Sequence, residues 1–573
     1  MPTSRTRFLS LMAVLGMSSI GVARAYASWP SDPTVNLPLC TAVNNQNAPA
    51  IASDGAGGAI VTWEDLRGTD YDIYSQRVSA AGTPLWTADG VALCSAAGDQ
   101  TLPAIVSDGA GGAIVAWQDG GRGDIFVQRV NAAGVPQWTA DGVALSSGAA
   151  VAPAIASDGA GGAIVTWVVA GATYDVRAQR VDATGVAQWT AGGVVLRTDA
   201  TSAAGATIVS DGAGGAIVSW YDDRNYGTTV NDIFAQRVDG SGTPQWTANG
   251  LAVCTATGTQ AFPVITTDGA GGAIIAWYDA RGGGNYIYAQ RVSTLGVLQW
   301  TGSGVPVCTA SGNHIYPSLF PQIAPDGAGG AIVTWNDYRN LAATSIDIYA
   351  QRLDATGVPQ WTTDGVALCA AASAQQAPTM VSDGAGGAIV TWYDNRNYAA
   401  DNSDIYAQRV SAAGVSQWAV NGVALSTAPG AQLSPILVAS GTGGAIVAWL
   451  DSRNGSAYDI YAQNLNADGT LGGPLESVAP PAAAASFALR SIEPNPSPGD
   501  AHVSFSLPDD LPARLVVYDV AGRLVESQAL GNLGPGAHSV QLGAQSSSLR
   551  PGVYRVGLVQ GSRQAFRNAV IFR

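Results

Sequence analysis

The sequence predicts an all-β protein that repeats one unit of about 50 to 58 residues, and three observations support this class. The segment SDGAGGAIVTW at 53–63 recurs along the chain, and SGTGGAIVAW at 440–449 occupies the same place in the last copy. The turns of the other copies begin at Asp108, Asp158, Asp211, Asp268, Asp326 and Asp383. Such a fixed period is the signature of a repeat architecture. Glycine accounts for 71 of 573 residues while 47% of residues are hydrophobic, which indicates a turn-rich chain with a buried core.

Each unit contains four short apolar runs that have the character of β-strands. In the first unit these are 49–53, 58–63, 72–78 and 90–94, and each run is bounded by Gly, Asp, Ser or Pro. No segment shows sustained helical periodicity. Four antiparallel strands, repeated eight times with both faces of each sheet apolar, are typical of a β-propeller whose blades pack face to face. We therefore predict an eight-bladed β-propeller over residues 28–475.

The repeated DGAGG segment is predicted to be the turn between the first and second strands of each unit. Asp-Gly and Gly-Gly supply the positive φ angles that a tight hairpin requires. The alternative is a calcium or phosphate loop, but the segment lacks the alternating carboxylates of the first and the lysine of the second.

The two ends of the array predict how a ring would close. The eighth unit ends without the QWTxDGVxL strand of the other units, and TVNLPLC at 34–40 supplies a strand of the missing type. We expect residues 35–40 to pair with DIYAQNL at 459–465, so that an N-terminal strand completes the last blade and leaves no open sheet edge. Of the 16 tryptophans, 15 fall at two repeat positions, and we expect Trp29 to take the one vacant place.

The first residues predict export. Arg5 and Arg7 precede an apolar stretch at 8–22 and then small residues, which is the pattern of a cleaved secretory signal peptide at 1–27. No other stretch approaches the roughly 18 apolar residues that span a bilayer, so the mature chain is expected to have no transmembrane segment. We predict a protein that is secreted or displayed on the surface of a Gram-negative-type bacterium.

The net charge limits the classes of partner, and the positions of the cysteines indicate whether disulfides form. All 27 basic residues are arginines, and the net charge of −15 argues against nucleic acid or an anionic lipid surface as a partner. The five cysteines occupy one repeat position, where neighbouring copies lie further apart than the roughly 7 Å between Cα atoms that a disulfide tolerates. We expect free, buried thiols that act as small apolar residues. These cysteines are Cys40, Cys94, Cys254, Cys308 and Cys369.

One face of the predicted ring varies more than the other. The link between the third and fourth strands is constant, whereas the link between the second and third strands is longest at 221–232, 336–347 and 393–404. Near these loops lies a long connection at 308–321. Variable loops on a rigid scaffold usually carry function, and tyrosines with polar neighbours suit a sugar or peptide ligand. The candidate ligand-binding residues are Arg224, Tyr226, His314, Tyr316, Tyr338, Arg339, Arg396 and Tyr398. The alternative is that these are only solvated loops.

An Asp-x-Arg element follows the second-strand Trp in nearly every unit, beginning with Asp65 and Arg67. A feature of nearly every unit is first of all structural. We expect the Asp to cap a turn and the Arg to pair with the Asp that opens the third strand, such as Asp72 or Asp404.

An arginine-rich propeller raises the alternative of a sialidase-like or other polysaccharide-acting enzyme. That chemistry requires an asymmetric cluster of arginines around a carboxylate, together with a nucleophile and an acid. Yet Glu64 is the only glutamate before residue 476, and no SxDxGxTW box is present. We predict no catalytic residue, metal or cofactor, and favour a binding or structural protein.

The tail differs from the repeats. A Pro/Ala-rich linker at 476–488 precedes alternating strands and Gly/Pro turns at 489–573, which suggest a small Ig-like β-sandwich. This tail resembles the C-terminal Ig-like modules of type IX secretion cargo and of the flagellar hook-capping protein. The matching residues are Pro494-Asn495-Pro496, Tyr518-Asp519, Gly522-Arg523, Gly552-Val553-Tyr554 and the final Arg573.

The resemblance implies a sorting or attachment module, with the outer-membrane secretion machinery as its partner. The repeats in turn resemble uncharacterised tandem WxDxR…DIYAQR arrays of exported bacterial proteins. A glycan or a protein is the expected ligand of the propeller.

Overall fold

The computed structural model describes residues 28–171, 174–199, 201–310, 321–441, 443–455, 457–473, 487–497, 501–508, 511–533, 536–542, 549–561 and 563–572. The expected signal peptide at 1–27 and most of the expected linker at 476–488 lie outside these residues. Contacts between Cα atoms divide the chain into Met1–Pro474 and Leu475–Arg573. We describe each unit by itself.

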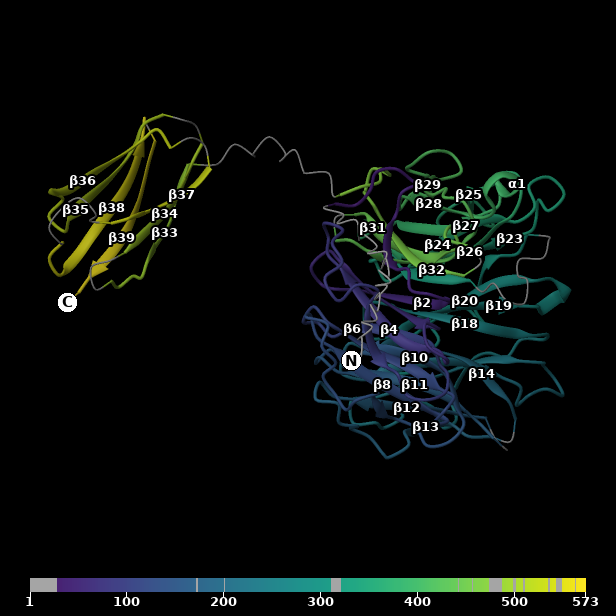
Figure 1. The fold of residues 1–573 in the computed structure, drawn as a ribbon. Coiled ribbons are helices and arrows are strands. Elements are labelled where there is room, and N and C mark those ends of the chain that lie inside the picture. The colour runs from purple at the N-terminus through teal and green to yellow at the C-terminus, as the bar shows by residue number, and fades with distance from the viewer. Residues whose placement is uncertain are drawn as a thin grey trace, which may run out of the picture. The chain divides into compact units, whose positions relative to one another are not determined.

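The described residues of the first unit form eight four-stranded antiparallel sheets (Figure 1). Sheets 1 to 4 contain β2(Gln46–Ser53), β3(Ala59–Asp65), β4(Asp72–Val78), β5(Val91–Cys94); β6(Gln100–Ser107), β7(Ala113–Asp119), β8(Asp124–Val130), β9(Val143–Ala144); β10(Ala150–Ser157), β11(Ala163–Ala170), β12(Tyr174–Val181), β13(Val194–Arg197); β14(Ala203–Ser210), β15(Ala216–Asp222), β16(Asp232–Val238), β17(Leu251–Cys254). Sheets 5 to 7 contain β18(Gln260–Thr267), β19(Ala273–Asp279), β20(Tyr286–Val292), β21(Val305–Cys308); β22(Gln322–Pro325), β23(Ala331–Asp337), β24(Asp347–Leu353), β25(Val366–Cys369); β26(Gln375–Ser382), β27(Ala388–Asp394), β28(Asp404–Val410), β29(Val423–Ser426). Sheet 8 has the order β1(Leu37–Cys40), β32(Asp459–Leu465), β31(Ala445–Asp451), β30(Gln432–Ala439). The short helices η1(Arg281–Gly283) and α1(Tyr398–Asp401) lie in connections between second and third strands.

The first strands of successive sheets contact one another in sequence, and the series closes because β30 of sheet 8 contacts β2 of sheet 1. Apolar clusters lie between neighbouring sheets. One cluster joins Ile332 and Ile348 of sheet 6 to Val390 and Trp392 of sheet 7. Sheets that pack face to face around a ring of first strands form a β-propeller, as the sequence predicts.

The N-terminal strand completes sheet 8. Leu37 pairs with Ala462, and Cys40 pairs with Ile460, so the expected pairing of residues 35–40 with 459–465 is confirmed for β1. In Figure 1 the purple start of the described chain accordingly lies beside β32.

Trp29 takes the vacant tryptophan place. Its indole Nε1 donates to the backbone oxygen of Ala80 at 2.9 Å, just as Trp86 Nε1 donates to Ala132 O at 3.0 Å in the next sheet. Trp29, Leu37, Leu39 and Cys40 are buried in one cluster with residues of sheets 8 and 1. The start of the described chain therefore joins the last sheet to the first.

The DGAGG segments are turns, as predicted. Gly55 and Gly57 have φ angles of 74° and 81°. Asp54 Oδ1 accepts hydrogen bonds from the N–H groups of Ala56 and Gly58, and Asp54 Oδ2 accepts one from Arg77 Nη2 at 2.9 Å. A Cβ atom at Gly58 would lie 2.3 Å from Val78 O, so only glycine fits there.

The second unit is a two-sheet sandwich. One sheet has the order β33(Ala488–Glu493), β34(His502–Leu507), β37(Gly536–Gln541), and the other has the order β36(Leu524–Gly531), β35(Ala513–Asp519), β38(Gly552–Gln560), β39(Arg563–Ile571). Val503 and Phe505 of the first sheet share a buried cluster with Val517 and Val556 of the second. Arg573, one of the residues that carry the family resemblance, lies outside the described residues.

Across the part of the chain that the structure describes, no helix is long and apolar enough to cross a membrane. All five cysteines are free and buried, as predicted.

Candidate functional site

A recurring polar node organises the face of the propeller that bears the variable loops. In sheet 7, Trp392 Nε1 donates to Asp394 Oδ2 at 2.9 Å, and Arg396 donates to both oxygens of the same carboxylate, from Nε at 2.9 Å and from Nη2 at 2.6 Å. The guanidinium lies 3.9 Å from the centre of the Tyr406 ring. It also donates to Asn421 O at 2.8 Å. The guanidinium therefore links the second and third strands of its own sheet to the turn that precedes the fourth strand.

The node also joins neighbouring sheets. Arg396 Nη2 lies 3.2 Å from the Sγ atom of Cys369, which belongs to sheet 6. Burial raises the pKa of the Cys369 thiol to about 12, so the thiol stays protonated. The cysteines are therefore more than small apolar residues, because each lies against an arginine of the next sheet. The pairs are Cys40/Arg67, Cys94/Arg122, Cys254/Arg281, Cys308/Arg339 and Cys369/Arg396.

The expected partner of these arginines needs correction. Arg67 forms its ion pair with Asp65 of its own Asp-x-Arg element, at 2.6 Å, rather than with Asp72. The planar guanidinium reaches both oxygens of a carboxylate two residues away, and this fixes the turn. In sheet 7 the third strand begins at Asp404, whose carboxylate instead accepts a hydrogen bond from Asn397 Nδ2 at 3.0 Å.

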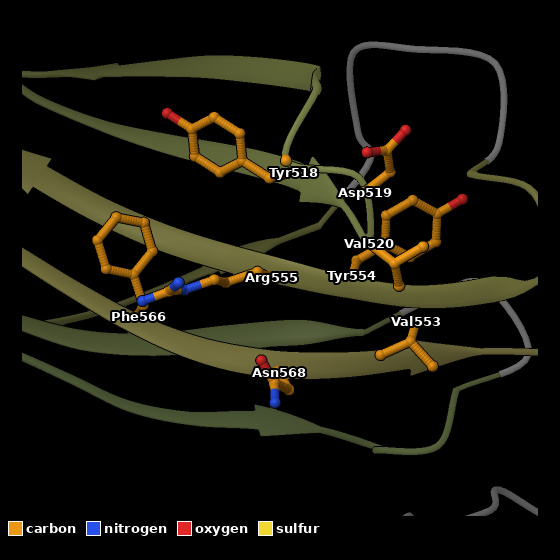
Figure 2. A pocket seen from close by; sticks show the side chains of 9 residues that line it. Tyr518, Asp519, Val520, Val553, Tyr554, Arg555, Phe566 and Asn568 are labelled. Carbon is orange, nitrogen blue, oxygen red and sulfur yellow. The ribbon is translucent and has the colours of Figure 1, made fainter.

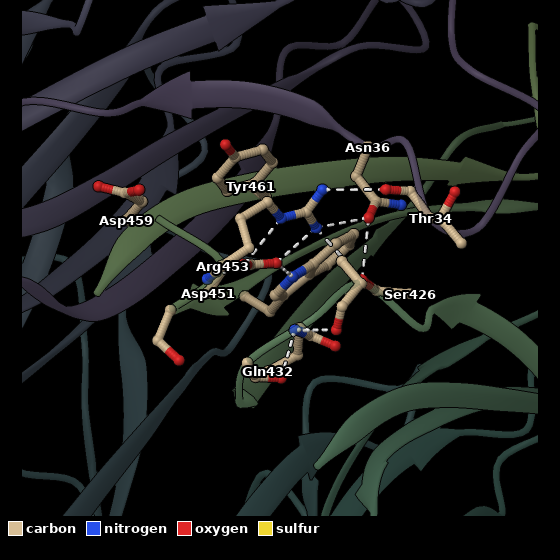
Figure 3. Close-up of polar contacts among 12 residues, drawn as sticks. Thr34, Asn36, Ser426, Gln432, Asp451, Arg453, Asp459 and Tyr461 are labelled. Carbon is tan, nitrogen blue, oxygen red and sulfur yellow. Dashed lines mark hydrogen bonds and ion pairs between the residues drawn. The ribbon is translucent and has the colours of Figure 1, made fainter. Parts of the chain in front are cut away.

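Sheet 8 builds its node partly from the N-terminal segment (Figure 3). Arg453 Nη2 donates to Asn36 Oδ1 at 2.7 Å, and Asn36 Nδ2 donates to Leu425 O at 2.8 Å. Ser426 occupies the cysteine position and donates to Asn36 Oδ1 at 2.9 Å. Residues about 390 positions apart are thus joined in one buried network.

Sheet 3 lacks the Asp-x-Arg element and replaces it. Arg177 stands where other sheets have an aromatic residue, and it donates to Gly192 O at 3.3 Å and to Asp175 Oδ2 at 3.1 Å. In sheet 7 the equivalent carbonyl, that of Asn421, accepts a hydrogen bond from an arginine of the loop after the second strand. In sheet 3 the donor is instead Arg177, which lies in the third strand. Within the described residues, Trp167 Nε1 has no hydrogen-bond partner.

The structure divides the predicted ligand-binding residues into three groups. The side chains of Arg224, Arg339 and Arg396 are 17–20% exposed, and each is paired with the Asp of its own element. Tyr226 and Tyr398 are 69% and 60% exposed and lie in the β15–β16 and β27–β28 connections, whereas Tyr338 is half-buried. His314 and Tyr316 lie outside the described residues. The structure pairs each arginine within its own sheet and does not gather the arginines around one point.

A second set of residues near the ring of first strands was missed from the sequence. Each such strand except β22 has a register shift at a residue with positive φ, such as Leu102 at 54°. The N–H of Leu102 donates to Glu64 Oε1 of the preceding sheet at 2.8 Å. Burial raises the pKa of the Glu64 carboxyl, and this hydrogen bond opposes the rise. The signal was available, since Glu64 is the middle residue of WxD, which varies from unit to unit.

Among the described residues, no group of three His, Cys, Asp or Glu side chains is placed to hold a metal ion.

No family model matches the chain, and no curated protein matches its sequence. Among solved structures, the chain is similar to a puromycin hydrolase mutant, at 13% identity and a TM-score of 0.38, over 75% of this chain and 61% of that one. It is similar to prolyl oligopeptidase B from Galerina marginata at 10% identity and a TM-score of 0.40, over 71% and 56%. It is also similar to an α-L-arabinanase of Penicillium chrysogenum at 11% identity and a TM-score of 0.32, over 65% and 94%.

The chain thus spans about three fifths of the length of the puromycin hydrolase and of the prolyl oligopeptidase. At these identities and TM-scores the likenesses do not bear on activity.

Proposed function

We propose that the chain is an exported or cell-surface binding protein of a Gram-negative-type bacterium. Its scaffold is an eight-bladed β-propeller, and a glycan or protein ligand binds at the loops between second and third strands. The eight four-stranded sheets and the contact of β30 with β2 support the blade number. In the tail, an Ig-like module serves as a sorting or attachment domain for the outer-membrane secretion machinery, which the motif resemblance supports.

The observation that carries the binding role is that the arginines of the variable loops are held by structural contacts while nearby tyrosines are exposed. Arg396 is held by Asp394, Tyr406 and Asn421, whereas Tyr398, two residues further on, is exposed. A sialidase-type centre requires free guanidinium groups that converge on a substrate carboxylate. Exposed tyrosines on a rigid base instead offer a stacking surface that is suited to binding.

A glycan array with the chain beginning at Ser28 tests this role. Tyr226→Ala and Tyr398→Ala are expected to weaken binding to the glycans that the parent chain retains, without changing thermal unfolding. Leu295→Ala is the matched control, because Leu295 is 83% exposed but lies in a link between third and fourth strands, on the opposite face. Binding that survives both tyrosine substitutions, or that Leu295→Ala reduces equally, would contradict the proposal.

The alternative is a sialidase-like or other polysaccharide-acting enzyme, and one observation favours it. Glu64 is a buried carboxyl near the ring of first strands, and burial raises its pKa; a carboxyl with a raised pKa is what a general acid requires. Turnover of a sialoside or polysaccharide by the purified chain, abolished by Glu64→Gln, would establish this alternative over the binding role.

A further inference from the structure

The outer face of the larger tail sheet carries a hollow that the propeller function does not use (Figure 2). It has a volume of about 550 Å³. Its walls include residues of two of the motif segments that the sequence singled out, Tyr518-Asp519 and Val553-Tyr554, together with Arg555, Phe566 and Asn568.

Strand register places the hollow on the solvent side of the sandwich. Tyr518, Arg555 and Asn568 form one row across β35, β38 and β39. The neighbouring row contains Val517 and Val556, which belong to the buried core. Because side chains alternate along a strand, the Tyr518 row points away from the core.

Gly557 lies at the bottom of the hollow and leaves room for an aromatic ring. Phe566 pairs with Gly557, where a Cβ atom would lie 2.4 Å from the phenyl ring. The ring therefore lies over the bare backbone of Gly557. Its centre is 6.4 Å from that of the Tyr518 ring, and the Arg555 guanidinium carbon lies 4.6 Å from the phenyl centre. Figure 2 shows Arg555 reaching toward Phe566, with Tyr518 on the adjacent strand.

The side chains that line the hollow favour a ligand that has both a carboxylate and an apolar face. Arg555 supplies a cation whose guanidinium fork suits a carboxylate, Asn568 supplies an amide, and the two rings supply apolar faces. The one carboxylate in the wall, Asp519, is already paired with Arg523 at 2.7 Å. The hollow therefore carries excess positive charge.

The backbone beneath the hollow argues against a peptide strand. β35 and β38 each pair with a strand on both sides, so their N–H and C=O groups are already used. An extended peptide is normally captured by free backbone groups at a sheet edge. On a sheet face only side chains are available, and they suit the rings, hydroxyls and carboxylates of a sugar acid.

The charges of the two units strengthen this choice. Residues 28–474 contain 16 arginines against 35 acidic residues, which gives a net charge of −19, whereas residues 475–573 contain eight arginines against seven acidic residues, which gives +1. An anionic polymer is repelled by the first unit and is tolerated by the second.

We propose that the hollow lined by Tyr518, Arg555, Phe566 and Asn568 binds an anionic oligosaccharide, with a uronic-acid carboxylate on Arg555 and a sugar ring against Phe566. This site is independent of the proposed propeller function. Binding of such a chain weakens as salt rises, since one charge pair contributes to it.

Calorimetric titration of the chain beginning at Ser28 with hexagalacturonate tests the site, and neutral maltohexaose serves as the uncharged comparison. Arg555→Gln is expected to weaken hexagalacturonate binding about tenfold, the size expected for loss of one hydrogen bond to a charged group. Arg514→Gln is the matched control, because Arg514 has the same charge and lines a separate hollow on this sheet. It should stay within about twofold of the parent, as tenfold is 1.4 kcal/mol and a rim charge contributes less.

Three results would overturn the site. They are no binding of hexagalacturonate by the parent chain, equal weakening by Arg514→Gln, and equal binding of maltohexaose. Tyr398→Ala separates the two proposals. If it abolishes hexagalacturonate binding and Arg555→Gln does not, the tail site is wrong and the propeller role stands.

Discussion

Arg396 and Tyr398 stand two residues apart in one loop and have opposite surroundings. The Arg396 side chain is 20% exposed and contacts the second strand, the third strand and the turn before the fourth strand of its own sheet, as well as Cys369 of the preceding sheet, whereas Tyr398 is 60% exposed. The first belongs to an element that recurs in nearly every unit, and the second to a stretch that changes between units. Repetition in this loop therefore marks structure, and variation marks the exposed surface to which we assign binding.

Sheet 3, which lacks the repeated element, also indicates that the element has a structural role. It has lost the Asp-x-Arg element, and Arg177 bonds to Gly192 O in its place. The contact between strands is kept although the residue that makes it has moved. The node is therefore a requirement of the blade rather than a remnant of a ligand site.

The largest test of the comparison removes the closing strand. Deletion of residues 28–40 takes away β1, Trp29 and the Asn36 contact of Arg453. At roughly 1.5 to 3 kcal/mol per buried aliphatic side chain, losing Leu37 and Leu39 alone costs several kcal/mol, and an open edge promotes aggregation. We expect the midpoint of thermal unfolding to fall sharply, as measured by calorimetry against the chain beginning at Ser28. An unchanged midpoint would show that the N-terminal segment does not close the ring.

A smaller loss is expected in the sheet that replaces its node. Arg177→Ala removes charged hydrogen bonds to Gly192 O and Asp175, and a bond of this type contributes about 1.5 to 3 kcal/mol. Chemical denaturation should show a destabilisation of that order. Val186→Ala, at an exposed position of the same sheet, is the control. If both variants unfold alike, Arg177 does not act as the substitute.

The smallest effect concerns the carboxyl that opens the third strand of sheet 8. Burial raises the pKa of Asp459 to about 6, and a hydrogen bond from Asn454 opposes the rise. A carboxyl whose pKa is higher in the folded state binds its proton more tightly there, so its ionisation destabilises the fold as pH rises through about 6. Asp459→Asn should therefore unfold at a higher temperature than the parent at pH 7.5, and this gain should vanish near pH 4.

Asp99→Asn, which changes an exposed carboxyl, is the control for that pH series. A gain for Asp459→Asn that is equally large at pH 4 and at pH 7.5 would show that burial of the charge is not the cause.

The repeat allowed much of the fold to be predicted from the sequence. The four strands of each unit, the DGAGG turns, the free cysteines and the pairing of 35–40 with 459–465 follow from period, glycine placement and counting. The first strand was predicted too short, because β2 begins at Gln46 rather than at residue 49. The partner of Arg67 did not follow, because Asp65 and Asp72 are both near in sequence and only the turn geometry selects between them. The contact of Glu64 with the N–H of Leu102 was also missed, because the variable position marks Glu64 as unusual but does not show that a bulge in the next sheet brings the Leu102 N–H to it.

The central claim is that repeated arginines hold the blades while variable tyrosines face a ligand. Arg396→Ala and Tyr398→Ala, compared by thermal unfolding and by binding on one glycan array, test it most directly. We expect Arg396→Ala to unfold at a much lower temperature, because it removes the cationic partner of the buried Asp394, a loss that costs about 3–5 kcal/mol. Tyr398→Ala should keep its unfolding temperature and lose binding. A stable Arg396→Ala that loses binding, together with a Tyr398→Ala that binds normally, would contradict the account.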